Sequence, residues 1–169
     1  MAYAGQTIEN PVSGERITFT QTAADTGGEL LAFDMTLSVD GHVPGAHVHP
    51  EQEERFEIVS GTMKFRMNGE KIVAGPGDVV TVPPGARHKF ANGGDEPVEV
   101  RVEVRPAMKM EDLLENTVAL AKEGAGRGVV LPRSARRRLV TRRRRSPAAG
   151  ACGAPGAGSS GPRPRRRRA

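Results

Sequence analysis

Near the middle of the chain, apolar and charged residues alternate strictly over eight positions. Val98, Val100, Val102 and Val104 alternate with glutamate and arginine, and Pro106 follows. Successive side chains of a β-strand point to opposite faces, so this period of two predicts a strand with one buried and one wet face. A helix would scatter the four valines around its axis. The segment therefore predicts an antiparallel sheet.

Two further segments repeat this pattern and are separated by turn residues. In residues 31–39 the odd positions are apolar, and the turn Asp40-Gly41 follows. Residues 63–67 have the same alternation and lead into Asn68-Gly69, a strong sequence signal for a tight hairpin, with 71–74 as the returning strand. Because such segments dominate up to about residue 105, the sequence predicts an all-β domain.

Beyond Pro106 the period changes from two to that of a helix. From Lys109 to Glu123 the apolar residues recur at helical spacing, and Gly124 is placed to end the helix. We expect one amphipathic helix that packs on the outside of the β-domain.

The remainder of the chain differs in charge and composition from everything before it. Residues 1–126 hold 11 basic and 20 acidic side chains, a net charge of −9, whereas 14 arginines and no acidic residue lie from Arg127 onward. A segment made largely of Arg, Ala, Gly, Pro and Ser buries too little apolar surface to fold, so this tail is predicted to be disordered. Two interpretations stay open. The arginines could bind nucleic acid through its phosphates, or the composition could reflect GC-rich codons in a shifted reading frame.

Cysteine usage and hydropathy bear on the compartment. Cys152 is the single cysteine, so neither an intramolecular disulfide nor a thiolate cluster can form. No apolar run approaches the ~20 residues of a membrane span, and residues 1–7 lack the features of a signal peptide. We expect a cytoplasmic protein with no membrane partner.

Four side chains of metal-binding type are spaced so that they can meet. His47 and His49 are two residues apart, so on a strand both imidazoles would project to the same face. Glu54 follows on an inward, apolar face of the next strand, where a carboxylate needs a partner such as a cation. His88 occupies an inward position on a third strand. The pattern predicts a metal site with ligands from three strands.

These residues belong to two longer motifs, Gly41-x5-His47-x-His49-x4-Glu54-x6-Gly61 and Gly77-x5-Pro83-x-Gly85-x2-His88-x3-Asn92. Both are similar to the two conserved motifs of the cupin superfamily, and their separation resembles that of small single-domain cupins. The resemblance covers about residues 10–106. It implies a double-stranded β-helix, the jelly-roll or cupin barrel, with the metal in its mouth, and usually a homodimer. The expected divisions are a barrel over 1–106, a helix over 107–124 and the disordered tail over 125–169.

Three other residues compete for the ligand positions. Glu51 and Glu53 are carboxylates beside Glu54, but Glu54 alone has the spacing to the other motif residues. His42 lies in the turn after Asp40, and we expect it to be a solvated loop residue.

The four ligands narrow the range of metal ions and reactions, but they do not identify a single ion or reaction. Three imidazoles and one carboxylate leave two open positions on an octahedral ion and suit Fe, Mn, Ni, Co, Zn or Cu. The resemblance implies a small-molecule enzyme such as a dioxygenase, an isomerase or a polyketide cyclase. A non-catalytic ligand-binding or sensor protein is the alternative. The pattern identifies no separate general acid or base, although Glu54 could serve if it left the metal.

Two groups near the motifs are candidates for a substrate pocket. Arg66, Arg87 and Lys89 could steer an anionic substrate, although solvated strand charges are commoner. Six apolar residues could line a pocket above the ion, with core packing as the simpler interpretation for most of them: Phe33, Met35, Met63, Phe65, Met67 and Phe90.

Overall fold

A computed structural model describes residues 2–43 and 45–126 and confirms the all-β fold with one helix. Of the tail predicted over 125–169, residues 127–169 lie outside the described residues, and residues 125 and 126 belong to the helix. The described elements are β1 (Thr7–Asn10), β2 (Glu15–Gln21), β3 (Leu31–Leu37), β4 (Glu53–Ser60), β5 (Met63–Met67), β6 (Glu70–Ala74), β7 (Val79–Val82), β8 (His88–Asn92), β9 (Val98–Arg105) and α1 (Met110–Gly126).

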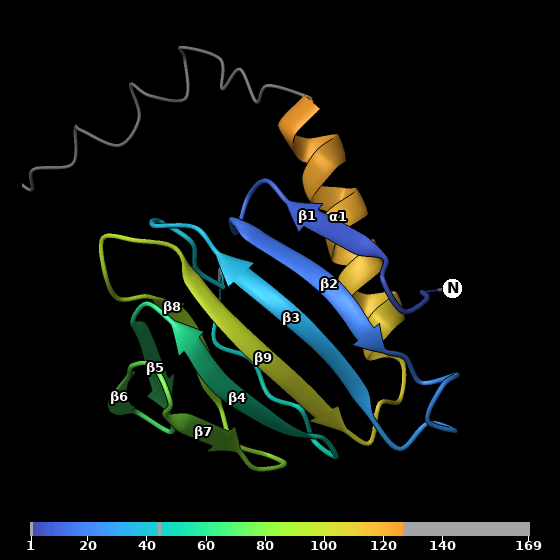
Figure 1. The fold of residues 1–169 in the computed structure, drawn as a ribbon, viewed down its shortest axis with the longest axis horizontal. Coiled ribbons are helices and arrows are strands. Elements are labelled where there is room, and N and C mark those ends of the chain that lie inside the picture. Colours follow the sequence, from blue (N-terminus) through green and yellow to red (C-terminus); the bar gives the residue numbers. More distant parts are fainter. Residues whose placement is uncertain (1, 44, 127–169) are drawn as a thin grey trace, which may run out of the picture. The chain divides into compact units, whose positions relative to one another are not determined.

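The strands form two antiparallel sheets, as the jelly-roll prediction requires (Figure 1). The larger sheet has the order β1-β2-β3-β9-β4-β7, and the smaller has the order β6-β5-β8. In the larger sheet β9 lies between β3 and β4, which are far from it in sequence. Strands distant along the chain therefore place their inward residues side by side.

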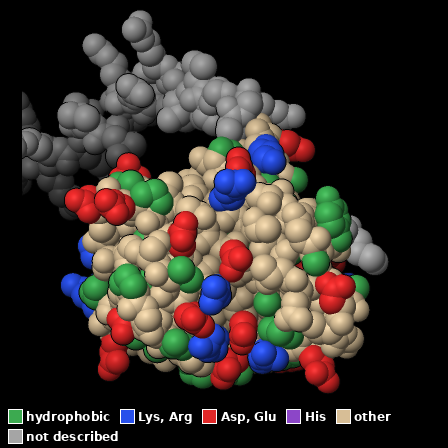
Figure 2. All heavy atoms as spheres, in the orientation of Figure 1, with side chains coloured by type: hydrophobic (Ala, Val, Ile, Leu, Met, Phe, Trp, Pro, Cys, Tyr) green, Lys and Arg blue, Asp and Glu red, His purple; other side chains and the backbone are tan. Residues whose placement is uncertain are grey.

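The core lies between the inner faces of the two sheets. Phe56 on β4 packs against Phe65 on β5 and Phe90 on β8, with ring centroids 5.2 and 5.3 Å apart. The four valines of β9 are at most 1% exposed, as their alternation predicts. On the outer face shown in Figure 2, acidic and basic side chains are interspersed. One of their ion pairs joins Arg101 to Glu57 at 3.7 Å.

Two turns have the backbone that their residues predict. Asn68 and Gly69 have φ values of 50° and 94° and join β5 to β6, which confirms the predicted hairpin. Gly61 has a φ of 79°, and a Cβ atom there would lie 2.8 Å from the Pro97 carbonyl oxygen. That position between β4 and β5 therefore requires glycine.

Helix α1 covers part of the larger sheet rather than standing apart from it. It lies behind β1 and β2 in Figure 1 and buries Met110 and Val118. Gln6 donates a 2.8 Å hydrogen bond to Glu115, and the Ala23 amide donates one to Glu111. The helix continues past the predicted end at Gly124 to Gly126. No helix within the described residues is long and apolar enough to cross a membrane.

Candidate metal centre

The segment that carries His47 and His49 is not the strand that their spacing predicts. It is extended and has isolated bridges, one of which pairs His47 with His88. Pro50 follows at once, and proline has no amide proton to continue a ladder. The four candidate ligands thus come from two strands and one bridged segment, which corrects the expectation of three strands.

Glu54 lies on β4 with its side chain on the inner face. Its neighbours across the sheet are Val104 on β9 and Val82 on β7, both at most 2% exposed. Glu54 itself is 7% exposed, whereas the adjacent Glu53 faces solvent. A carboxylate in such an apolar row is costly unless a cation or hydrogen-bond donors compensate it.

His88 is the first residue of β8 and is fully buried. It pairs with Met67 on β5, and its backbone exchanges two 2.9 Å hydrogen bonds with His47. The smaller sheet and the bridged segment therefore position His88 and His47 together.

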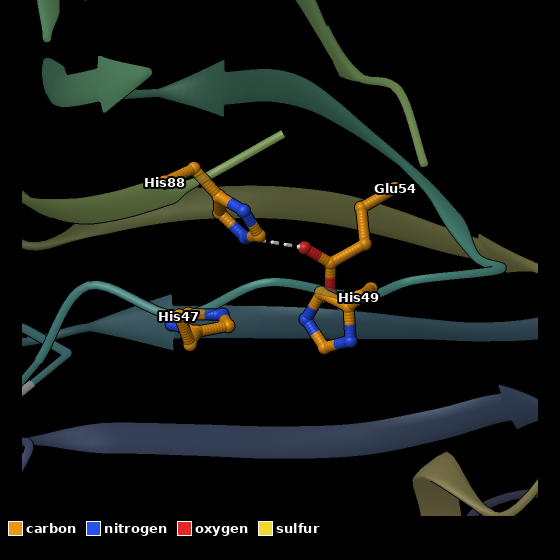
Figure 3. A group of neighbouring side chains, drawn as sticks. All are labelled: His47, His49, Glu54 and His88. Atoms are coloured by element: carbon orange, nitrogen blue, oxygen red, sulfur yellow. Dashed lines mark ion pairs between the residues drawn. The ribbon is translucent and has the colours of Figure 1, made fainter. Parts of the chain in front are cut away.

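All four side chains converge on one point (Figure 3), and each offers a ligand atom within 4.8 Å of the other three. His88 Nε2 lies 2.8 Å from Glu54 Oε2, and His49 Nε2 lies 3.5 Å from Glu54 Oε1. Apart from these contacts with one another, the buried atoms His49 Nε2, Glu54 Oε2 and His88 Nε2 have no polar partner within the described residues.

Backbone carbonyl groups set the tautomers of two of the histidines. His47 Nδ1 lies 3.2 Å from the Gly45 carbonyl oxygen, and His88 Nδ1 lies 3.1 Å from that of Ala86. A carbonyl only accepts, so Nδ1 carries the proton in both rings. This leaves the Nε2 lone pairs directed at the shared point, which is the usual arrangement of a ligating histidine.

The pKa values of His47 and His88 shift in opposite directions. Burial lowers the pKa of His47, and the nearby His88 and His49 add to that effect, while the Gly45 carbonyl and Glu54 oppose it. Burial also lowers the pKa of His88, but the Glu54 carboxylate and the Ala86 carbonyl outweigh it and raise the pKa above 6.5. The negative charge of Glu54 therefore stabilises positive charge on the neighbouring imidazole of His88.

The site fits a divalent transition-metal ion. Three nitrogen donors and one carboxylate are the ligand types such ions prefer, and a cation would satisfy the three buried atoms without hydrogen bonds. The structure thus brings together all four predicted ligands; that they hold a metal stays a prediction. The competing residues lie elsewhere: Glu51 and Glu53 are exposed, and His42 contacts the Asp40 carbonyl oxygen at 3.0 Å.

A cavity of about 240 Å³ opens beside these ligands. Its wall is largely apolar and includes no lysine or arginine, so Arg66, Arg87 and Lys89 do not line it. Phe33, Met35 and Phe90 do, as three of the six predicted pocket residues. The wall consists of Asn10, Glu15, Ile17, Phe33, Met35, Val43, His47, His49, Glu54, Phe56, Phe90, Val102, Met110, Leu113, Leu114 and Thr117.

Sequence reasoning missed the part of this wall that comes from β1, β2 and α1. The helix contributes Met110, Leu113, Leu114 and Thr117, although it was expected to pack outside. Glu15 was also missed. It precedes Ile17 and Phe19 at alternate positions of β2, and this period of two is the signal that could have placed it on the inner face.

Comparison with known proteins agrees with this fold. Residues 33–104 match the family described as Cupin domain. Over 67 residues the chain is 27% identical to the tetracenomycin polyketide synthase protein TcmJ of Streptomyces glaucescens. That alignment covers 40% of this chain and 45% of the relative, so the chain spans less than half the length of the curated relative it matches.

Solved structures with the same fold have little sequence identity to the chain. A predicted oxalate decarboxylase of Thermotoga maritima is 22% identical, with a TM-score of 0.54 over 61% of this chain and 92% of its own. KdgF from Halomonas is 16% identical, with a TM-score of 0.54 over 63% and 93%. Streptomyces PAC13, solved with uridine, is 22% identical, with a TM-score of 0.51 over 64% and 81%. At these identities the likeness shows the fold alone.

Proposed function

The chain is a small protein of the cupin superfamily, and from that premise we propose that it is a metal-dependent enzyme acting on a small molecule. The reaction class is an oxygenation, an isomerisation or a cyclisation of the kind found in polyketide assembly. His47, His49, Glu54 and His88 would hold one divalent ion per chain. The ion is Fe, Mn, Ni, Co, Zn or Cu.

One observation carries the proposal. The four candidate ligands converge at a buried point, and three of them, His47, His49 and Glu54, also line a cavity large enough for an organic ligand. A site that served only to stabilise the fold would be closed by further protein ligands, whereas this one adjoins open volume. The arrangement supports binding of a substrate next to the ion.

Each side chain has a separate task in this proposal. A bound ion would supply Lewis acidity and, if it is redox-active, the chemistry of dioxygen. Glu54 contributes the negative charge that attracts the cation. The carbonyl groups of Gly45 and Ala86 hold the imidazoles of His47 and His88 in the tautomer with Nε2 free. The apolar side chains of the cavity exclude water from the ligand.

The cavity wall indicates the chemistry of the substrate. It has no lysine or arginine to pair with an anion, and ten of its sixteen residues are phenylalanine, methionine, leucine, isoleucine or valine. A ring-containing molecule with a few oxygen atoms suits such a wall better than a small dicarboxylate. The similarity to TcmJ, named as a tetracenomycin polyketide synthase protein, supports a substrate of polyketide type.

The test is turnover by protein loaded separately with each candidate ion. Oxygen uptake and product formation would be measured with a catechol, a β-diketone and a flavonol, in air and without oxygen. We expect one metal form to convert at least one of these compounds, and the His49→Ala variant to lose that activity together with the metal.

A matched pair of variants separates the site from its surroundings. Glu54→Gln removes the buried carboxylate, and Glu53→Gln removes its exposed neighbour on the same strand. Activity should fall in the first and be retained in the second. Tight ligand binding without turnover by any metal form would contradict the enzyme and support the non-catalytic alternative.

A further inference from the structure

Glu15 is a second carboxylate on the cavity wall, apart from the four candidate ligands. It begins β2 and shares the inward row of that strand with Ile17 and Phe19, which are 3% and 0% exposed. Its neighbours across the sheet are Leu37 on β3 and Asn10 on β1, both buried. Glu15 itself is partly buried, and a carboxylate at an inward position of the strand needs a polar partner.

Only one of the two carboxylate oxygens of Glu15 accepts a hydrogen bond within the described residues. Ser13 donates a 2.5 Å hydrogen bond from Oγ to Glu15 Oε2. Within the described residues, Oε1 accepts no hydrogen bond and the side chain forms no ion pair. Glu15 also borders an open pocket with Arg16 and Lys122, but no ion pair joins it to either of them within the described residues. On the side of the metal ligands the cavity wall contains no lysine or arginine, so a ligand bound there is the natural partner for the second oxygen.

The charged and titratable groups around Glu15 favour proton uptake. Burial raises the pKa of its carboxyl group, and the charge of Glu54 adds to this, whereas the Ser13 hydroxyl and His42 lower it. The titratable and charged residues that share a pocket wall with Glu15, or act on its charge, are Glu9, Arg16, His42, His47, His49, Glu54 and Lys122.

We infer that Glu15 is the group that takes a proton from a hydroxyl group of the bound ligand. The ligand O–H bond breaks, a new O–H bond forms at Glu15 Oε1, and the electron pair stays on the ligand oxygen. Ser13 acts as a positioning residue by fixing Oε2. The inference rests on the proposed function and deepens it, because it assigns a proton acceptor separate from the metal ligands and selects hydroxylated ligands.

Proton counting on the zinc-loaded protein tests this without any turnover. Catechol would be titrated calorimetrically near pH 7 in two buffers of different protonation enthalpy, which gives the number of protons released per ligand bound. The wild type should release about one proton fewer than Glu15→Gln, because Glu15 retains it. The difference should shrink at higher pH, where solvent becomes the better acceptor.

Glu15→Gln preserves the shape of the side chain and can still accept from Ser13, so the variant should keep its fold and its zinc. Its affinity for catechol should fall about tenfold, since one charge-assisted hydrogen bond is lost. Glu9→Gln, which removes an exposed carboxylate on β1 that does not line the cavity, should keep the wild-type proton count. Ser13→Ala should lie between the wild type and Glu15→Gln.

The two ways of failing are distinguishable. If both the wild type and Glu15→Gln bind catechol and release the same number of protons, the inference about Glu15 is wrong while the proposed ligand site stands. If zinc-loaded wild-type protein takes up no catechol, the proposed ligand class fails, and the role of Glu15 fails with it.

Discussion

The two halves of the candidate metal centre are held in different ways. Glu54 and His88 lie on β4 and β8, within hydrogen-bonded sheets, and are 7% and 0% exposed. His47 and His49 lie on a segment that has isolated bridges in place of a strand and are only partly buried. We therefore expect the strand half to act as a fixed platform and the bridged half to adjust more readily to the ion or ligand that binds.

The largest expected effect is on metal binding, where the two halves should respond unequally. His88→Ala removes a fully buried donor whose place water cannot easily take, so affinity should fall by more than about a thousandfold. His47→Ala leaves a partly exposed position that water can occupy, and the loss should be nearer a hundredfold. Competition titrations with a chromophoric chelator would measure both constants.

Equal losses in these two variants would contradict the difference between the halves. Circular dichroism of each variant serves as the control, because a common unfolding would also abolish binding.

The next effect is on stability in the absence of metal. Phe56 follows Glu54 by two residues on β4, is 1% exposed and packs against two other phenylalanines, so Phe56→Ala should cost about 3–5 kcal/mol of unfolding free energy. Val48 lies between the two histidines and is 44% exposed, so Val48→Ala should cost less than about 0.5 kcal/mol. Urea denaturation would measure both losses of unfolding free energy. Similar losses in the two variants would contradict the view that the strand half is the more rigidly packed part of the centre.

A smaller effect concerns protonation of the metal-free protein. Because Glu54 raises the pKa of His88, Glu54→Gln should lower that pKa, and the pKa of His47 should change less. Protonated His88 stabilises the metal-free wild type below the unfolded pKa near 6.5, and this contribution is lost as pH rises through the raised pKa. Ring-proton NMR titrations would follow each histidine.

For His47 the sign of the linkage is opposite. Its lowered pKa means that its contribution to stability is present above the unfolded pKa and is lost as pH falls through the folded value. With metal bound both rings must be neutral, so affinity should rise with pH. A pKa of His88 that is unchanged in Glu54→Gln would show that the carboxylate does not control its proton.

The smallest effect at the metal site is expected from removing residues 127–169. All four candidate ligands precede the cut, so metal content and unfolding of the shortened chain should match the full chain. Its net charge changes from +5 to −9, so any salt-sensitive binding of the full chain to DNA should disappear. Loss of metal on truncation would mean that both halves of the centre depend on the removed segment.

The sequence predicted most of the β-domain because local patterns are sufficient for it. The alternating valines of β9 predict a strand with one buried face. The Asn68-Gly69 pair predicts the backbone conformation of a tight hairpin turn. The four candidate ligands could also be identified from the sequence, because their spacing matches the two motifs of the cupin superfamily. The expected homodimer stays a prediction.

The features that the sequence left open are the contacts between segments that are far apart in the chain. The 47–49 segment has strand-like spacing, but whether it joins a sheet depends on its partner, and only a bridge to His88 forms. Likewise, the helical period of 109–123 specifies an apolar face without saying what that face covers. Helix α1 packs against β1, so Leu113 and Thr117 come to line the same cavity as Glu15, about a hundred residues earlier in the chain. Such contacts depend on the packing of separate elements, which no local period encodes.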